Sequence, residues 1–438
     1  MQTRYKKGTL GRCSDREPEW YDKWRKSLNN EQDYIIYISG TPIYVEVDAY
    51  EHYKQFLERC GLYYDKFFDW EKWEECEIMH GSSRIASVLR NGSCVIYAPE
   101  MMPYNLYLEP EVGEDIDLRT QNIENFYHWC STRLLPEKRE FSKEIWNSLV
   151  KKPPVNDKER ALLAMSYLCL SLTDIYWIKR PEQMTKTDFA KINLYENFMN
   201  SGYMDITLSG KQIMLENPQM LRDNLSTGGC FPKAWIWKSD GLYLLKAGKE
   251  NEVKNELLAS KICQCFQVNQ VVYEEGDYNG QLVSACRIMT SLEYSIVPIE
   301  YYEIYLLNAG IDKAQGILEL DSYSYYMMNI VDYLIGNTDR HWGNWGVLVN
   351  NATNQPVRLH DLMDFNKAFG TYDTIDGAGC LTCLQPREYK TQKEAAIEAV
   401  RKIGLNQIAE VQAEWFIDAD VKEMFFKRLK ILKSTERV

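Results

Sequence analysis

The sequence predicts an α+β fold in which a strand-rich part is followed by a mostly helical part, and three observations lead to this prediction. Apolar runs at 241–246 and 283–289 have the length and composition of strands, with a helical pattern at 251–263 between them. Residues 322–335 carry one apolar stripe at helical spacing. From about residue 391 to 433 the pattern is helical as well.

The composition is that of a folded globular protein. Apolar residues make up 45% of the 438 residues and aromatic residues 13%, which excludes a low-complexity disordered chain. The length predicts about two or three domains. A net charge of −12 argues against direct nucleic-acid binding, which needs a basic face. No apolar run approaches the roughly 20 residues that span a bilayer, so we expect no membrane span.

The 12 cysteines are scattered along the chain, and no secretory segment follows Met1. This pattern indicates reduced thiols and a cytoplasmic protein. Cys380 and Cys383 have zinc or redox spacing, but no second pair of ligands completes a tetrahedral site. We therefore expect no metal at this pair.

Residues 1–115 are predicted to form an N-terminal α/β region of unknown role. Two β-rich runs flank the turn Gly40-Thr-Pro42, and residues 49–59 carry helical spacing. The Trp and Tyr side chains of this region are expected in a core rather than in a ligand cage. The acidic stretch 109–117 has the composition of a linker.

Residues 116–203 are predicted to form a helical region, also of unknown role. Segments 123–130 and 159–172 repeat apolar residues at intervals of three and four. Three charged residues either belong to a recognition surface or, as we favour, form surface salt bridges and caps: Arg133, Arg139 and Asp174.

The strand at 241–246 ends in Lys246, and the helix that follows carries Glu252 and Glu256. A strand lysine held by a carboxylate on the next helix can present its ammonium group to nucleotide phosphates. Glu256 and Glu252, which lies one turn earlier, are both candidates for this carboxylate. Upstream, the turn Ser226-Thr-Gly-Gly-Cys-Phe-Pro-Lys233 has two adjacent glycines, which let backbone amides approach a phosphate closely.

The stretch 333–349 is the richest in polar groups of chemical interest. Asp339 is followed five residues later by Asn344, and a predicted strand–turn–strand then leads to Asp364. This order supplies a carboxylate that orients an acceptor hydroxyl and two oxygen ligands for Mg²⁺, which are the parts that phosphoryl transfer needs. Asp361 either joins the metal site or caps the turn. The layout predicts ATP and Mg²⁺ as cofactors.

Asn337-Thr-Asp-Arg-His-Trp-Gly-Asn344 resembles the catalytic loop of HipA-like serine/threonine kinases and, more distantly, that of phosphatidylinositol 3/4-kinases. Met363-Asp-Phe-Asn366 resembles the metal-binding segment of the same kinases. Ser226 to Lys233 resembles the HipA-like phosphate loop, and Lys246 matches the ATP-binding lysine. The resemblance covers about residues 204–438.

This resemblance implies a two-lobed protein-kinase-like fold, with a small β-rich lobe at 204–290 and a large helical lobe at 291–438. It implies a bacterial, cytoplasmic enzyme that transfers the γ-phosphate of ATP to a Ser or Thr hydroxyl of a protein. A toxin or regulatory role and an antitoxin or regulatory partner are compatible with it. Ser226 matches a serine that HipA-like kinases phosphorylate on themselves, where a phosphate adds about −1.5 to −2 charges.

The resemblance also assigns roles to individual residues. Nucleotide binding is assigned to Ser226, Thr227, Gly228, Gly229, Lys233, Lys246 and Glu256. The metal ligands are Asn344 and Asp364. Asp339 orients the acceptor and takes its proton, while Arg340 and His341 either brace the loop or neutralise charge on the transferred group. Two other classes stay open: a kinase of a lipid or small molecule, and a pseudokinase that serves as a binding module.

Overall fold

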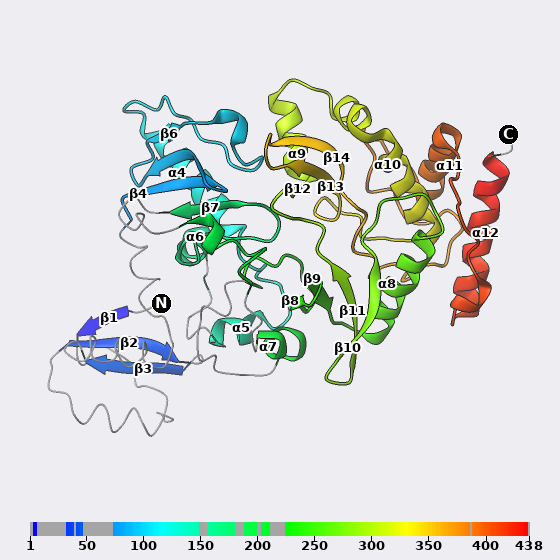
Figure 1. The fold of residues 1–438 in the computed structure, drawn as a ribbon, viewed down its shortest axis with the longest axis horizontal. Coiled ribbons are helices and arrows are strands. Elements are labelled where there is room, and N and C mark those ends of the chain that lie inside the picture. Colours follow the sequence, from blue (N-terminus) through cyan, green and yellow to red (C-terminus); the bar gives the residue numbers. More distant parts are fainter. Residues whose placement is uncertain are drawn as a thin grey trace. The chain divides into compact units, whose positions relative to one another are not determined.

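The structure is a computed structural model of the chain (Figure 1). It describes the following residues: 3–6, 32–38, 41–46, 73–148, 154, 156–179, 188–198, 203–210, 224–385 and 388–436. The helix expected at 49–59 lies outside the described residues.

The chain divides into two compact units, each described here by itself. Unit 1 comprises Met1–Pro99, Leu106–Leu172 and Tyr176–Trp235, and unit 2 comprises Glu100–Asn105, Thr173–Ile175 and Ile236–Val438. Helices and antiparallel strand pairs occur together, as a mixed α and β fold requires. The domain boundaries expected at 115, 203 and 290, and the two-lobed arrangement, stay predictions.

The described residues of unit 1 form two sheets. The first has the strand order β1-β2-β3, and β2 and β3 correspond to the two expected β-rich runs, with Thr41 and Pro42 belonging to β3. The second has the order β6-β5-β4-β7. The strands are β1 (Thr3–Lys6), β2 (Gln32–Ile38), β3 (Thr41–Glu46), β4 (Glu75–His80), β5 (Ser83–Leu89), β6 (Cys94–Ile96) and β7 (Tyr176–Lys179).

The helices of unit 1 are α4 (Ile116–Ser131), α5 (Ser142–Ser148), α6 (Asp157–Ser166) and α7 (Tyr203–Ser209), with a short 3-10 turn, η4 (Phe189–Lys191). Trp73, Phe126 and Trp129 are fully buried, so these aromatic side chains belong to a core. Helix α6 ends earlier than the expected 172, because Leu168 and Cys169 adopt left-handed backbone angles that break the helical ladder.

Unit 2 contains a sheet with the strand order β10-β11-β9-β8 and a helix that follows β9. Its elements are β8 (Lys233–Lys238), which begins in unit 1, β9 (Gly241–Lys246), α8 (Glu250–Cys263), β10 (Tyr273–Tyr278) and β11 (Gln281–Arg287). The strand expected at 241–246 and the helix expected at 251–263 are therefore confirmed. The strand expected at 283–289 is present two residues earlier.

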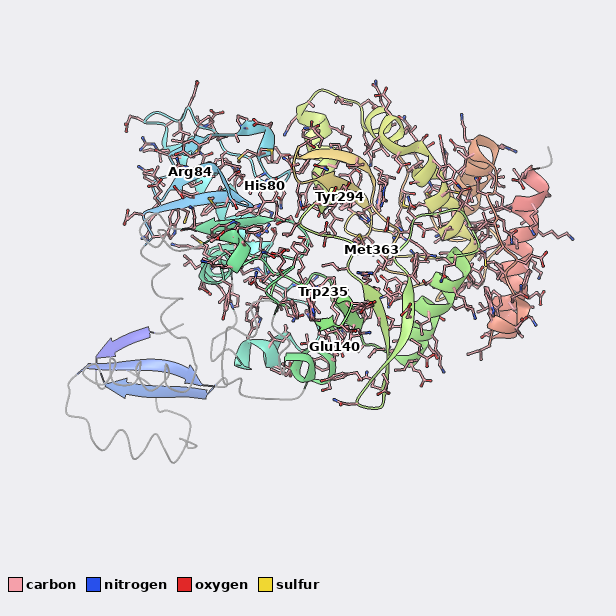
Figure 2. The ribbon with its side chains drawn as sticks, in the orientation of Figure 1. His80, Arg84, Glu140, Trp235, Tyr294 and Met363 are labelled. Carbon is pink, nitrogen blue, oxygen red and sulfur yellow. The ribbon has the colours of Figure 1, made fainter. Side chains whose placement is uncertain are left out.

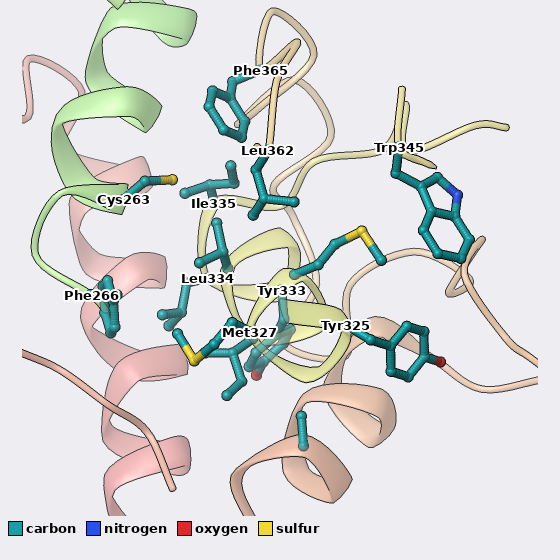
Figure 3. Packing of buried hydrophobic residues seen from close by; sticks show 14 of the residues in the cluster. Cys263, Phe266, Tyr325, Met327, Tyr333, Leu334, Ile335, Trp345, Leu362 and Phe365 are labelled. Carbon is teal, nitrogen blue, oxygen red and sulfur yellow. The ribbon is translucent and has the colours of Figure 1, made fainter. Parts of the chain in front are cut away.

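Helix α10 (Lys313–Ile335) supports the core of unit 2, and it bends at Asp321, whose backbone is not helical. The stripe expected at 322–335 is confirmed, since five of its side chains are at most 1% exposed: Met327, Ile330, Val331, Leu334 and Ile335. Figure 3 shows part of this cluster, with Phe365 and Cys263 among its members. Gly336 ends α10 in a left-handed conformation, φ 60°, where a Cβ atom would collide with the Tyr372 ring.

The rest of unit 2 comprises a second sheet of order β12-β13-β14 and further helices. These elements are β12 (Tyr294–Pro298), α9 (Ile299–Asn308), β13 (Gly346–Asn350), β14 (Gln355–Leu359), α11 (Gln392–Ile403) and α12 (Ala419–Glu436), with 3-10 turns η2 (Pro99–Met101, at the border of the two units) and η6 (Ala413–Trp415). The helical pattern expected from about 391 to 433 is confirmed at α11 and α12, whereas residues 404–418 between them are not α-helical. Among the described helices, none is both long and apolar enough to cross a membrane.

One buried arginine fastens α12 to the end of α10. Arg428 is fully buried and donates 2.6 Å hydrogen bonds to the carbonyl oxygens of Tyr333 and Thr374. Its guanidinium also lies 4.1 Å from the centre of the Tyr372 ring and 4.9 Å from that of Tyr333. The C-terminal helix thus packs on the element that leads to the loop after Gly336.

We expect Arg428→Ala to lower the free energy of unfolding by about 3 kcal/mol, because buried carbonyl oxygens lose their donor and a cavity replaces the side chain. Lys427→Ala is the matched control, since Lys427 is exposed and pairs only with Glu423 on the same helix. Urea unfolding followed by circular dichroism measures both. Equal stability of the two variants would contradict the role of Arg428.

Candidate functional site

Strand β9 and helix α8 bring Lys246 and Glu256 together inside unit 2. Lys246 Nζ lies 2.7 Å from Glu256 Oε1, and the two residues are 6% and 1% exposed. The hydroxyl of Ser284 on β11 donates to the second oxygen of Glu256. Burial disfavours the charged lysine, but the carboxylates of Asp364 and Glu256 outweigh it and raise the pKa of Lys246 well above its ordinary value. The ammonium group is therefore retained.

Glu252, the alternative partner of Lys246, pairs with a different lysine. Its Oε1 lies 2.7 Å from the Nζ of Lys367, three residues after Asp364. The two glutamates of α8 stand one turn apart and hold different cations. Glu256 thereby connects α8 to Lys246 on β9, and Glu252 connects α8 to the segment that carries Asp364.

Asp364 faces Lys246, whereas Asp361 does not take part in this contact. Asp364 Oδ1 is 3.1 Å from Lys246 Nζ, and the Asp361 carboxylate pairs with Arg358 at 2.8 Å. Asp364 also has a left-handed backbone, φ 61°. Such a conformation is costly for a residue other than glycine and is often found at functional sites. Of the two aspartates, Asp364 has the geometry expected of a site residue.

Arg340 is the brace of the loop that follows Gly336. Its guanidinium is 2% exposed and makes two 3.0 Å hydrogen bonds to the carboxylate of Asp332 on α10. It also donates to the carbonyl oxygens of Asn344, at 2.8 Å, and Met363, at 2.6 Å; Met363 is labelled in Figure 2. Between the two roles considered for Arg340, this geometry corresponds to bracing the loop.

Asp339 and Asn344 are held at fixed positions by the same loop. The side-chain Nδ2 of Asn344 donates to the Asp339 carbonyl oxygen at 2.8 Å, so the Asn344 Oδ1 is the side-chain atom that could accept from a donor or bind a cation. The Asp339 N–H donates to Asn337 Oδ1 at 3.2 Å. Burial raises the pKa of Asp339, with His341 opposing this and Asp364 adding to it. His341 itself is exposed, and its Nδ1 accepts from the Gly343 N–H.

The oxygen atoms assembled here suit Mg²⁺ held together with a nucleotide. The described residues contain no group of three or more His, Cys, Asp or Glu able to hold a metal ion by themselves. Mg²⁺ is usually bound through one or two carboxylates, with phosphate oxygens and water completing its shell. Asp364 and the Asn344 Oδ1 are hard oxygen ligands, so their chemistry fits such a site.

The predicted phosphate loop belongs to unit 1. Within it, Gly229 has φ +86°, and a Cβ atom there would collide with the Lys233 ammonium group, so this lysine folds over the glycine. Thr227 is buried and its hydroxyl donates to the Asn224 carbonyl at 2.7 Å. Ser226 is half-buried, and Gly228 and Gly229 are exposed. The glycines thus present open backbone to solvent.

Arg139 fastens the two ends of this loop, which the sequence did not suggest. It is 2% exposed and donates to the carbonyl oxygens of Thr227, at 2.9 Å, and Lys233. The backbone N–H of Glu140, labelled in Figure 2, donates to the Cys230 carbonyl. Arg133 is also buried and donates to the Cys169 and Tyr176 carbonyls. The expectation that both arginines form surface salt bridges was therefore wrong.

Sequence reasoning also missed several residues of unit 2 that contact the predicted site. They are Tyr273, Ser284, Asp332 and Lys367. A signal existed for Asp332, because a charged residue within the apolar stripe of α10 must find a partner when buried. The other three make contacts that depend on the tertiary fold.

No protein-family model and no curated protein matches the chain. Several solved structures show some likeness, among them the following two. The Helicobacter pylori proinflammatory kinase CtkA is 16% identical, with 46% of this chain and 90% of that chain covered and a TM-score of 0.36. HipA of Shewanella oneidensis MR-1, solved in a complex with HipB and operator DNA, is 11% identical, with 83% and 99% covered and a TM-score of 0.44. At these TM-scores the likeness is too weak to assign a site or an activity.

A buried histidine next to the site gives unit 2 a pH dependence. His360 is 4% exposed and its Nδ1 lies 2.8 Å from the Asp361 carbonyl oxygen. Burial is the main reason that the pKa of His360 is lowered from 6.5 to about 4. Between these two pH values the unfolded chain binds a proton that the folded chain does not, so the free energy of unfolding falls as the pH drops.

We expect the wild-type protein to lose about 2 kcal/mol of stability through His360 between pH 7 and pH 5. His360→Asn removes the titrating group and should show a correspondingly flatter profile. The measurement is urea unfolding of both proteins at several pH values, because the difference between them isolates this histidine. Parallel profiles would show that His360 does not titrate as its burial implies.

Proposed function

We propose that the chain is an ATP- and Mg²⁺-dependent phosphotransferase that transfers the γ-phosphate to a Ser or Thr hydroxyl of a protein. The observation that carries this proposal is the contact of Lys246 with both Glu256 and Asp364. This contact brings together three groups from separate segments of unit 2. They are the ammonium group of Lys246, the carboxylate of Glu256 that holds it, and the carboxylate of Asp364, which is proposed as a metal ligand. Kinases need this combination to bind nucleotide phosphates.

In this proposal, Lys246 binds phosphate oxygens and Glu256 keeps its ammonium group in position. Asp364 and the Asn344 Oδ1 hold Mg²⁺. When bound, the ion supplies charge neutralisation and orientation of the phosphate oxygens. Lys367 lies close enough to Asp339 to oppose the rise in its pKa that burial causes. It therefore adds positive charge to the same region.

Asp339 orients the acceptor hydroxyl and takes its proton. Support comes from its position in a loop braced by Arg340 and from its raised pKa, since a carboxylate made more basic accepts a proton more readily. His341 is exposed and its ring accepts from the loop backbone, so it helps to shape the loop. Phosphoryl transfer demands positioning more than covalent chemistry, and a rigid loop supplies that.

The proposal extends to the loop in unit 1. The open backbone at Gly228 and Gly229 and the ammonium of Lys233 suit anion binding. Ser226 is proposed as a site of self-phosphorylation, on the basis of its match to the phosphate loop of HipA-like kinases. A bacterial cytoplasmic setting and an antitoxin or regulatory partner stay predictions.

The test is incubation of the purified protein with Mg-ATP, followed by intact-mass and peptide mass spectrometry. We expect a gain of phosphate, with the Ser226 peptide among the products. In Asp339→Asn the rate should fall by about 10²-fold or more, because the proton acceptor is lost. Asp277→Asn is the control, since Asp277 is an exposed aspartate near the end of β10 whose carboxylate accepts from the Gly280 N–H of the following turn, and it should behave as wild type.

Other outcomes distinguish the remaining classes. ATP consumed only after addition of lipid or metabolite extracts, with no phosphate on protein, would contradict a protein substrate and favour a lipid or small-molecule kinase. Binding of ATP without turnover in any condition would contradict an enzyme and favour a pseudokinase.

A further inference from the structure

Tyr273 is a buried residue that contacts both Lys246 and Asp364, the aspartate proposed as a metal ligand. It is the first residue of β10 and is 6% exposed. Its ring meets Phe365 edge-on, with centroids 6.0 Å apart, and Lys246 Nζ lies 4.6 Å from its centre. A ring in this position packs against the residue that directly follows Asp364.

The Tyr273 hydroxyl oxygen accepts two hydrogen bonds from two different segments. Lys246 Nζ donates to it at 3.1 Å, and the backbone N–H of Asp364 donates to it at 3.1 Å. These donors use both lone pairs of the oxygen. One oxygen atom thus fixes the distance between the Lys246 ammonium group and the Asp364 backbone.

The three hydrogens of the Lys246 ammonium group are all engaged by protein acceptors. Their acceptors are Glu256 Oε1, the Tyr273 oxygen and Asp364 Oδ1. If Lys246 is to bind a phosphate, one acceptor must release its hydrogen. Asp364 is the natural one, because its carboxylate is also the proposed metal ligand. The bonds from Lys246 and from the Asp364 backbone to Tyr273 do not need to change.

We propose that Tyr273 is a positioning residue whose hydroxyl keeps Lys246 and the Asp364 backbone in register, so that the Asp364 carboxylate would be placed to hold Mg²⁺ when the ion binds. This inference rests on the proposed function. The hydroxyl acts as a neutral acceptor, since burial raises the pKa of Tyr273 well above its ordinary value although Lys246 opposes this. The consequence is a coupling between phosphate binding and metal binding that depends on a single oxygen atom.

Tyr273→Phe tests the role of this oxygen, because it keeps the ring, its contact with Phe365 and its contact with Lys246. We expect the Kd for Mg-ATP, measured by isothermal titration calorimetry, to rise roughly tenfold. The Mg²⁺ concentration that half-saturates binding at fixed ATP should rise as well. A purely structural role would change the thermal stability without this change in Mg²⁺ dependence.

The matched control is Tyr325→Phe. Tyr325 is also buried in unit 2, at 9% exposed, and its hydroxyl donates to the Thr382 carbonyl oxygen at 3.0 Å. Its removal deletes a hydroxyl of similar burial that contacts neither Lys246 nor Asp364. Mg-ATP affinity and Mg²⁺ dependence should stay at wild-type values.

A second measurement is independent of nucleotide. Hydrogen–deuterium exchange of the peptide containing Asp364 should be severalfold faster in Tyr273→Phe, because the Asp364 N–H loses its acceptor. Unchanged exchange, or an unchanged Kd and Mg²⁺ midpoint, would overturn the inference and leave the proposed function intact. If the wild-type protein binds no Mg-ATP, the proposed function fails first and the inference fails with it.

Discussion

The buried ion pair of Arg340 with Asp332 is the interaction on which the arrangement of unit 2 depends. Through one guanidinium, the end of α10 is joined to the loop that carries Asp339 and to the Met363 carbonyl. A buried pair of this kind adds little net stability compared with apolar packing. Its effect is specificity, since a charged side chain at 2% exposure leaves the loop few alternative conformations.

A second cluster, centred on Lys246, meets the first at two consecutive residues. Met363 accepts from Arg340, and Asp364 faces Lys246. Two adjacent residues, Met363 and Asp364, therefore connect β9 and α8 to α10 and the loop that follows it. A displacement of this segment would affect both clusters.

The sequence predicted the parts of the structure that follow from local patterns. The apolar stripe of α10 and the succession from β9 to α8 have strong periodicity, and a lysine at 246 facing a carboxylate on α8 followed from that order. The choice of Glu256 over Glu252 came from the resemblance to HipA-like kinases. The left-handed residues that shorten α6 had no such signal, because Leu168 and Cys169 are not typical of that conformation. The role of Arg139 was missed because its carbonyl partners lie 88 and 94 residues away, and carbonyl acceptors are present at every position of a chain. Tyr273 was missed because its role depends on tertiary contacts.

The left-handed backbone of Asp364 has an implication for how this position can change over time. Glycine or asparagine would adopt φ 61° more readily than aspartate, so selection for stability alone favours replacing the carboxylate. Selection for the proposed metal ligand opposes that replacement. Stability and the proposed activity thus favour different residues at position 364. Relatives that have lost the activity should carry glycine or asparagine there.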